Sequence, residues 1–223
     1  MRIIGGTAGR RVLKVPKGLA VRPTPDLVRQ AIFNSLADRV IGARVLELFA
    51  GTGAFALECL SRGAASAICV ELSSKHAGFV HRNLEALGLD RTRFQVRVQD
   101  AYAAIHQLAA EGAQFDLVFA DPPYGEKNIG RRSRSDAQQL LDEQSLPRLV
   151  APGGLFILGH ARRDTLDLDP ALWEERKTLK HGDSLMRFLV PTHRQPPTPS
   201  PSHLRGEGAR LIRPGSRTKA EGG

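Results

Sequence analysis

Short apolar segments alternate along this chain with longer segments whose apolar residues recur at helical spacing. The short segments predict buried strands at 44–49, 67–71, 94–99, 115–120 and 155–158. The longer segments predict helices at 54–62, 73–87, 101–110 and 135–149. Two further segments, 171–179 and 184–190, predict a closing antiparallel hairpin. Strands that alternate with helices predict an α/β fold with a parallel, doubly wound sheet.

The residues before the first strand predict a small extension. Short apolar pieces around glycines over 2–15 are typical of a hairpin. Thr24 then stands as a candidate N-cap, with Pro25 in the first turn and Asp26 complementing the helix dipole. We therefore divide the chain into a hairpin-plus-helix extension (1–43), a main domain (44–191) and a Pro/Arg-rich tail (192–223). The tail is too polar to build a core and is predicted to be disordered.

Positive charge gathers at both ends of the chain. The net charge is +9, and residues 1–44 carry nine Lys or Arg against two acids. Such a distribution favours an arm that contacts the phosphates of a nucleic acid, although a solvated structural extension explains it too. The candidate RNA-binding residues are Arg2, Arg10, Arg11, Lys14 and Arg22.

Several classes of protein are disfavoured by composition. No apolar segment is long enough for a membrane span or a signal peptide, so we expect a cytoplasmic protein. Cys59 and Cys69 form neither a disulfide framework nor a metal spacing. The histidines also lack ligand spacing, so we expect no metal, and we expect a monomer.

The motif Asp121-Pro122-Pro123-Tyr124 follows the apolar run 115–120. Two prolines cannot continue a strand, because each lacks an N–H and has a fixed φ. The carboxylate, the carbonyls and the ring are therefore presented at the carboxyl end of a strand, where open α/β sheets bind ligands. We treat all four residues as candidate catalytic residues.

Acidic residues also stand at the ends of the three earlier strands, at Glu47, Glu71 and Asp100. The loop Gly51-Thr52-Gly53 is a weak dinucleotide fingerprint, since a pyrophosphate prefers cations and helix N-termini to a carboxylate. S-Adenosylmethionine has an ammonium group, a ribose diol and an adenine amine that carboxylates accept well, and it has no phosphate. It is therefore the expected cofactor, and a nicotinamide cofactor is a distant alternative.

Residues 1–190 resemble the bacterial family that methylates a guanine N2 in small-subunit ribosomal RNA. The matching pieces are Arg2-Ile3-Ile4-Gly5-Gly6, Arg22-Pro23-Thr24-Pro25-Asp26, Val28-Arg29, Phe33-Asn34, Leu48-Phe49-Ala50-Gly51-Thr52-Gly53, Asp121-Pro122-Pro123-Tyr124 and Gly182-Asp183-Ser184. The resemblance implies a Rossmann-like class I methyltransferase sheet of seven strands with a reversed last strand. It also implies small-subunit rRNA as the substrate, alone or in an assembling ribosomal particle.

The resemblance assigns cofactor roles to particular residues. It implies that Glu47, Phe49, Gly51 and Gly53 lie near the methionine end, that Glu71 binds the ribose hydroxyls, and that Asp100 and Ala101 lie at the adenine. Two departures stand out: the family usually has Asp where Glu47 stands and Glu-His where Gly159-His160 stands. We assign no role to these departures.

An exocyclic guanine amine is a poor nucleophile, because its lone pair is delocalised into the ring. We expect the Asp121 carboxylate and the Pro122 carbonyl to accept its two hydrogens, and Tyr124 to stack on the base. Two alternatives keep the same motif: a methyltransferase for adenine N6 in DNA, and a non-catalytic RNA-binding assembly factor that retains a cofactor pocket.

Overall fold

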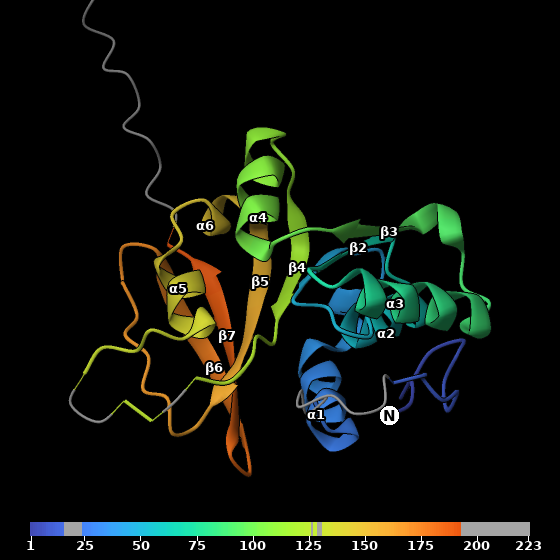
Figure 1. Ribbon diagram of the computed structural model, residues 1–223, viewed down its shortest axis with the longest axis horizontal. Coiled ribbons are helices and arrows are strands. Elements are labelled where there is room, and N and C mark those ends of the chain that lie inside the picture. Colours follow the sequence, from blue (N-terminus) through green and yellow to red (C-terminus); the bar gives the residue numbers. More distant parts are fainter. Residues whose placement is uncertain (16–23, 126, 129–130, 193–223) are drawn as a thin grey trace, which may run out of the picture. The chain divides into compact units, whose positions relative to one another are not determined.

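A twisted seven-stranded sheet organises the chain, and the computed structural model describes residues 1–15, 24–125, 127–128 and 131–192 (Figure 1). The strands are β1 Arg44–Leu48, β2 Ser66–Glu71, β3 Phe94–Val98, β4 Phe115–Ala120, β5 Val150–Ala161, β6 Trp173–His181 and β7 Ser184–Pro191. The helices are α1 Asp26–Leu36, α2 Ala54–Ser61, α3 Ser74–Leu87, α4 Ala101–Ala110, α5 Asp136–Asp142 and α6 Leu146–Leu149. None of the helices in these ranges has the length and apolar composition needed to cross a membrane.

The strand order in the sheet is β3-β2-β1-β4-β5-β7-β6. Neighbours from β3 to β5 pair in parallel, whereas β7 runs antiparallel to both β5 and β6. The predicted α/β class, the parallel strands and the closing hairpin are thus confirmed, and so is the reversed strand that the resemblance implied. This order also brings the carboxyl ends of β1, β2, β3 and β4 to one edge, where ligands bind in such sheets.

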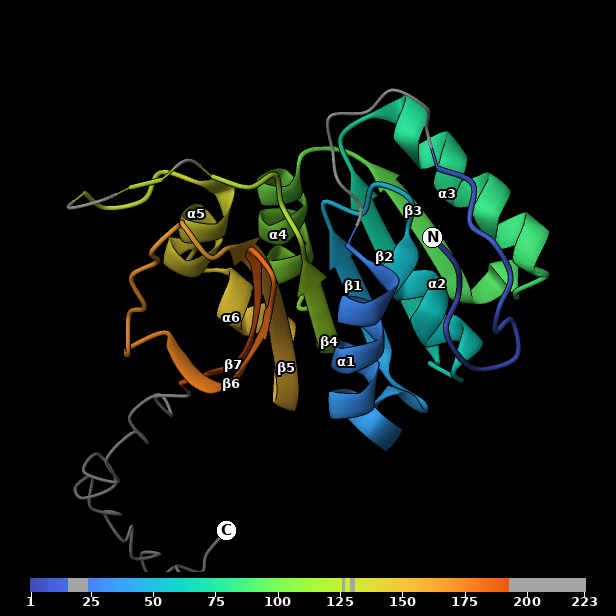
Figure 2. The ribbon, with the colours of Figure 1, turned by 90° about the horizontal axis from the view of Figure 1, so that it is seen from below.

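Helices cover both faces of the sheet (Figure 2). On one face, α1, α2 and α3 pack with alternate strand residues such as Leu117 and Phe119 of β4. On the other face, α4, α5 and α6 pack with the residues in between, such as Val118 and Ala120. Because successive side chains of a strand point to opposite faces, the apolar run of β4, interrupted only by Asp116, is what a strand buried on both sides requires.

The structure corrects two predicted elements. The helix expected over 135–149 is broken into α5 and α6, because Glu143 has an extended backbone and Pro147 lies in the first turn of a new helix. The fifth strand is longer than predicted and starts at Val150. The glycines at 153 and 154, which were expected to form the turn before it, lie within the strand beside an irregularity in its pairing with β4.

Residues 1–15 form a strap on α2 in place of a regular hairpin. A single antiparallel bridge joins Arg2 to Val12, and Ile3 and Leu13 are buried in the same core as α1 to α3. The buried carboxylate of Glu58 accepts from the backbone N–H of Ile4 at 2.7 Å and of the next residue at 2.8 Å. The proposed boundary at 43 remains a prediction. The predicted tail from 193 onward and Arg22 lie outside the described residues.

Candidate active site

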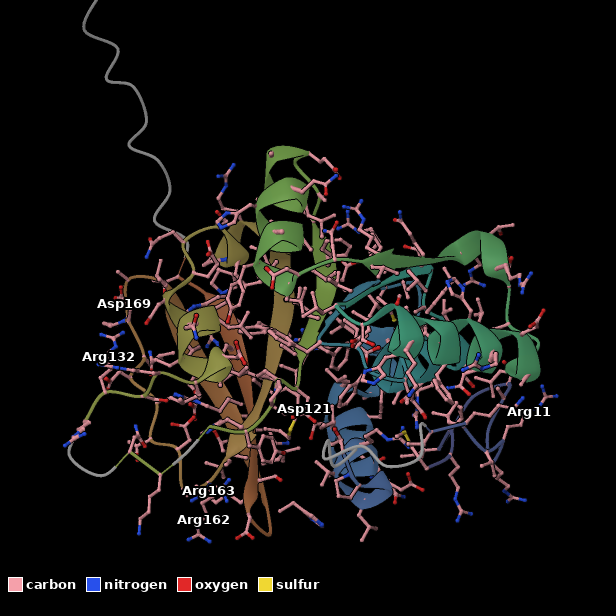
Figure 3. The ribbon with its side chains drawn as sticks, in the orientation of Figure 1. Arg11, Asp121, Arg132, Arg162, Arg163 and Asp169 are labelled. Carbon is pink, nitrogen blue, oxygen red and sulfur yellow. The ribbon has the colours of Figure 1, made fainter. Side chains whose placement is uncertain are left out.

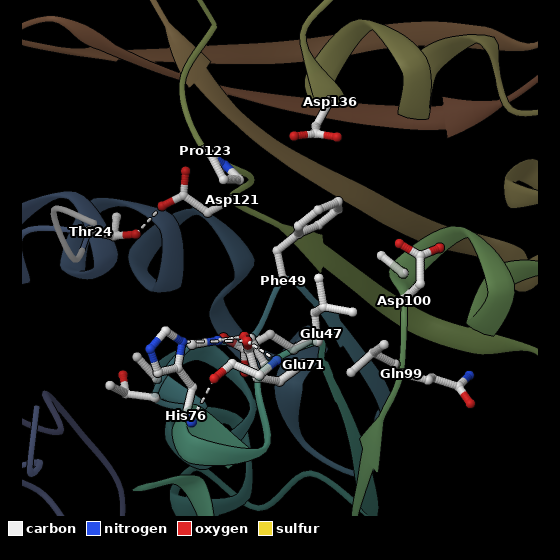
Figure 4. Close-up of a pocket in the computed structure, with 18 of the residues that line it drawn as sticks. Thr24, Glu47, Phe49, Glu71, His76, Gln99, Asp100, Asp121, Pro123 and Asp136 are labelled. Atoms are coloured by element: carbon white, nitrogen blue, oxygen red, sulfur yellow. Dashed lines mark hydrogen bonds and ion pairs between the residues drawn. The ribbon is translucent and has the colours of Figure 1, made fainter. Parts of the chain in front are cut away.

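A cavity of about 490 Å³ opens at the carboxyl edge of the sheet (Figure 4). All four of the predicted acidic residues line it, although they are far apart in the sequence: Glu47, Glu71, Asp100 and Asp121. Phe49 and Gly51 line it as well, together with Ala101 at the start of α4. In Figure 4, Thr24 and Asp121 lie at one side of Phe49, and Gln99 and Asp100 lie at the other. The structure therefore brings these predicted residues together in one cavity, and their roles remain predictions.

The glycine loop between β1 and α2 makes a tight turn that depends on two glycines. Gly51 and Gly53 have φ values of 55° and 73°, which favour glycine. A Cβ on Gly53 would lie 2.9 Å from Cγ1 of Val80, so close packing against α3 requires glycine there. Phe49 also has a positive φ, 54°, which is uncommon for an aromatic residue. This backbone holds the Phe49 ring at the cavity.

Glu47 supports the loop from below. Its side chain is 3% exposed, and its two carboxylate oxygens accept from the backbone N–H of Phe55 at 3.2 Å and of Ala56 at 2.8 Å. These donors are unpaired groups at the start of α2, so the carboxylate satisfies them as a cap does. Burial raises the pKa of Glu47 to about 7, against those hydrogen bonds. Its geometry is that of a support for α2 and the loop, at the inner wall of the cavity.

Glu71 ties the glycine loop to the start of α3. One oxygen accepts from Gly51 N at 2.7 Å, and the other accepts from Ser73 N at 2.9 Å and lies 3.4 Å from Nδ1 of His76. The side chain of Ser73 caps α3 through the His76 amide, as the sequence predicts. Glu71 is thus held rigidly at the cavity wall, and each carboxylate oxygen can still accept from a ligand hydroxyl.

Asp100 is the N-cap of α4. Its Oδ1 accepts from the backbone N–H groups of Tyr102 at 2.9 Å and Ala103 at 3.0 Å. Its other oxygen makes no hydrogen bond among the described residues, and the residue lines the cavity beside Gln99. The capping role and a ligand-binding role are therefore compatible, because they use different oxygens.

Asp121 lies at the end of β4, and its two oxygens differ. The Thr24 hydroxyl donates to Oδ2, whereas Oδ1 is buried and has no partner among the described residues. Burial raises the pKa of Asp121 to about 6, and the hydrogen bond from Thr24 opposes that rise. Thr24 was predicted to cap α1, which is wrong: the N-cap is Pro25, and the Thr24 side chain points to Asp121.

The Asp121 carboxylate rests against Gly159 of β5. A Cβ at Gly159 would lie 2.9 Å from Cγ of Asp121, closer still to Oδ1, and 3.2 Å from Sδ of Met186. Any larger residue would displace the carboxylate. In this chain, the glycine at this departure from the family pattern, to which the sequence assigned no role, leaves room for the Asp121 carboxylate.

The other residues of the motif differ in exposure. Pro122 is buried, and Pro123 is exposed and lines the cavity. Tyr124 is 39% exposed and does not line the cavity; its hydroxyl donates to Oγ of Ser184 on β7 at 2.9 Å. The motif thus contributes Asp121 and Pro123 to the cavity and a partly exposed aromatic ring outside the cavity lining.

The predicted RNA-binding residues of the strap have different environments. Arg2 forms an ion pair with Asp26 at 3.4 Å, and Nη1 of Arg11 donates to the Leu87 carbonyl at the end of α3 at 2.6 Å. Arg10 and Lys14 are exposed, and no ion pair involving their side chains occurs among the described residues. Arg10 and Lys14 are therefore the better candidates for contacts with phosphates.

Sequence reasoning missed several residues of the site. Thr24, His76, Gln99 and Asp136 line the cavity, as do Met1 and Leu72. No pattern distinguishes a threonine that caps a helix from one that donates to a distant carboxylate, because the contact spans 97 positions. In the part of the chain that the structure describes, no group of three His, Cys, Asp or Glu side chains is arranged to hold a metal ion.

The sheet order, the reversed β7 and a cavity at the carboxyl edge define the class: a Rossmann-like class I methyltransferase fold. A solved structure supports it directly. The chain superposes on a putative methyltransferase, yhhF from Escherichia coli, with a TM-score of 0.68 and 32% identity. The superposition covers 86% of this chain and 97% of that one.

The chain belongs to the family described as Conserved hypothetical protein 95, whose model matches residues 1–190. It is 38% identical over 144 residues to a putative rRNA methyltransferase, YlbH from Bacillus subtilis, covering 64% of this chain and 78% of that protein. It is 40% identical over 124 residues to ribosomal RNA small subunit methyltransferase D of Escherichia coli. That match spans 56% of this chain and 60% of the relative. The resemblance to a family of S-adenosylmethionine-dependent rRNA methyltransferases is therefore confirmed.

Proposed function

We propose that this protein transfers a methyl group from S-adenosylmethionine to the exocyclic N2 amine of a guanine in small-subunit rRNA. The observation that carries the proposal is Asp121, which lines the same cavity as Glu71 and Asp100 and whose buried Oδ1 has no partner among the described residues. In the reaction the amine nitrogen forms a bond to the methyl carbon, the carbon–sulfur bond breaks, and the nitrogen loses a proton. S-Adenosylhomocysteine and the methylated base are the products.

The chemistry of the cavity suits S-adenosylmethionine. The volume is within the usual range for small-ligand sites, roughly 300–1,000 Å³. Glu71 would accept from the ribose hydroxyls, Asp100 would accept from the adenine amine through its free oxygen, and Phe49 offers an apolar surface for the cofactor. When bound, the cofactor supplies an activated methyl group on a sulfonium, so this chain has to position the acceptor amine and receive its proton.

Asp121 and the Pro122 carbonyl would accept the two hydrogens of the target amine. These bonds favour a tetrahedral nitrogen whose lone pair points at the methyl group. With a pKa of about 6, the Asp121 carboxylate is mostly ionised at neutral pH and is able to accept. Asp121 or water would take the proton, which is released readily once the amine is methylated. Most of the acceleration would come from orientation for in-line attack.

The target base has to leave its stack to reach Asp121, which costs least in unpaired RNA. Tyr124 follows Pro123 of the cavity wall and is partly exposed, and its ring would stack on the extruded base, a contact typically worth about 1–3 kcal/mol. The choice of the small subunit is supported by the similarity to ribosomal RNA small subunit methyltransferase D of Escherichia coli, and the choice of guanine follows from the family resemblance of residues 1–190. The four residues of the Asp-Pro-Pro-Tyr motif do not by themselves distinguish guanine from another base that carries an exocyclic amine.

Transfer of a labelled methyl group to small-subunit rRNA tests this function. We expect robust transfer by the native protein, loss in Asp121→Ala, and unchanged binding of S-adenosylhomocysteine in both. Asp38→Ala is the matched control, because Asp38 is exposed and its side chain makes no hydrogen bond or ion pair among the described residues. Full activity of Asp121→Ala would overturn the mechanism. Methyl transfer to DNA in place of rRNA would contradict the proposed substrate.

A further inference from the structure

Several exposed cations lie on the loops that follow β4 and β5. Four of them, Lys127, Arg131, Arg162 and Arg163, are what we call the basic wall. None of the four forms an ion pair with an acid in the described part of the chain, in contrast with Arg132, which pairs with Asp142 at 2.6 Å. An uncompensated cluster of this kind attracts a polyanion, whereas a paired arginine does so weakly.

Backbone and side-chain hydrogen bonds hold the two loops together. Asn128 donates to the Thr165 carbonyl at 2.8 Å and accepts from the Thr165 N–H at 2.9 Å. Nε of Arg163 lies 3.4 Å from the carbonyl oxygen of Gly125, the residue after the Asp-Pro-Pro-Tyr motif. The basic wall is therefore a fixed surface that begins where the motif ends.

The wall also reaches the turn between β6 and β7. The N–H of Arg162 donates to the Asp183 carbonyl at 2.7 Å, and Tyr124 bonds to Ser184 in the same region. In Figure 3, Arg162 and Arg163 lie to one side of Asp121, and Arg11 of the strap lies to the other side, beyond α1. Cations thus flank Asp121 from both directions.

Acidic groups near the wall do not cancel its charge. Asp164 is buried behind Gly125, so its carboxylate does not face solvent. Asp167 lies 4.0 Å from Arg132, the arginine that is already paired. Asp183 is exposed but forms no ion pair with Arg162 among the described contacts. Among the described residues, the exposed cations of the wall are therefore not neutralised by ion pairs with these acids.

We propose that the basic wall binds the phosphates of the RNA strand on one side of the extruded base, while the strap binds the strand on the other. This inference rests on the proposed function. It assigns to RNA a second contact surface that the charge pattern of the sequence did not indicate, because residues 45–192 are slightly acidic as a whole. An aromatic ring beside unpaired arginines is a combination that single-stranded nucleic acid binds.

The salt dependence of RNA binding tests the wall. In the double variant Arg162→Gln/Arg163→Gln, loss of two phosphate contacts should reduce the slope of log K against log salt by about 1.4 for single-stranded RNA. Over the tenfold range from 1 M to 0.1 M salt, this change in slope makes the RNA affinity of the variant about 25-fold weaker than that of the native protein. The probe is a small-subunit rRNA fragment, and its affinity is measured by fluorescence anisotropy over a range of salt concentrations.

Two single variants serve as matched controls. Arg148→Gln removes an exposed cation that precedes β5, at the opposite edge of the sheet, and should leave both slope and affinity unchanged. Arg132→Gln removes a cation of the same loop that is already paired, and should change the slope by much less than one contact. Thermal stabilisation by S-adenosylhomocysteine should be the same in all variants, which shows that they fold.

The outcomes separate the wall from the proposed function. If the double variant methylates rRNA at the native rate and its salt slope is unchanged, the proposed role of the basic wall is refuted, while the proposed function stands. Absence of RNA binding by the native protein would overturn both proposals. If the double variant did not fold, Lys127→Gln/Arg131→Gln removes the other two cations, which lack side-chain hydrogen bonds in the described structure. The same reduction is expected there, and no reduction would refute the wall.

Discussion

Replacing Gly159 by alanine should inactivate the protein without unfolding it. The added Cβ would lie 2.9 Å from Cγ of Asp121, whereas ordinary contact begins near 3.4 Å, and Oδ1 is nearer than Cγ. The carboxylate therefore has to move by about 1 Å, which breaks its hydrogen bond from Thr24. A misplacement of this size at a reacting group costs about 100-fold in rate, or roughly 2.7 kcal/mol.

Single-turnover methyl transfer to rRNA measures this effect. The rate constant should fall about 100-fold, while the affinity for S-adenosylhomocysteine, measured by calorimetry, stays unchanged. Gly78→Ala is the matched control: Gly78 lies within α3, and a new Cβ would lie an ordinary 3.7 Å from Nη1 of Arg82 in the same helix. That variant should have native activity and gain about 0.5–1 kcal/mol in stability. Native activity of a folded Gly159→Ala protein would refute the positioning of Asp121 by Gly159.

Three further predictions concern titration and charge. Thr24→Val removes the hydrogen bond that lowers the pKa of Asp121. The acid limb of the pH profile of kcat/KM, expected near pH 6 in the native protein, should therefore shift to higher pH. An unshifted limb would contradict the role of Thr24. Burial raises the pKa of Glu47 from its ordinary 4.5 to about 7 in the fold, so folding favours the protonated form. Its contribution to stability is complete below about pH 4.5 and is lost as pH rises through 7. In urea unfolding, the stability of the native protein relative to Glu47→Gln should therefore fall by about 3 kcal/mol between pH 4.5 and 8, and a pH-independent difference would exclude this titration. Arg10→Gln should weaken RNA binding alone, whereas Arg11→Gln should also lower the melting temperature by removing the bond to the end of α3; equal melting temperatures would contradict this distinction.

The sheet was predictable because its strands are buried on both faces. Short apolar runs such as 115–120, interrupted only by Asp116, favour buried strands over amphipathic helices, and the acids that end them mark the carboxyl edge. Residues within a motif, such as Gly51 and Asp121, were therefore predicted to lie at this edge, and both line the cavity. The break between α5 and α6 was missed because a proline in a first turn is compatible with both a new helix and the start of a continuous one.

The contacts made by the Asp121 carboxylate could not be predicted from the sequence. Thr24 looks like a helix cap, and Gly159 looks like a small residue in a strand. Their roles depend on the distance from each to the Asp121 carboxylate, which tertiary packing alone determines. The basic wall was hidden for a similar reason: its cations are mixed with acids along the chain, and pairing in three dimensions neutralises some arginines and spares others.

Nucleoside analysis of the methylated product tests the central proposal most directly. Small-subunit rRNA from a strain that lacks this protein is incubated with purified protein and labelled S-adenosylmethionine, then digested to nucleosides. We predict that the label appears in N2-methylguanosine and is absent when Asp121→Ala replaces the native protein. Label in N6-methyladenosine, or no label with a native protein that still binds S-adenosylhomocysteine, would contradict the proposal.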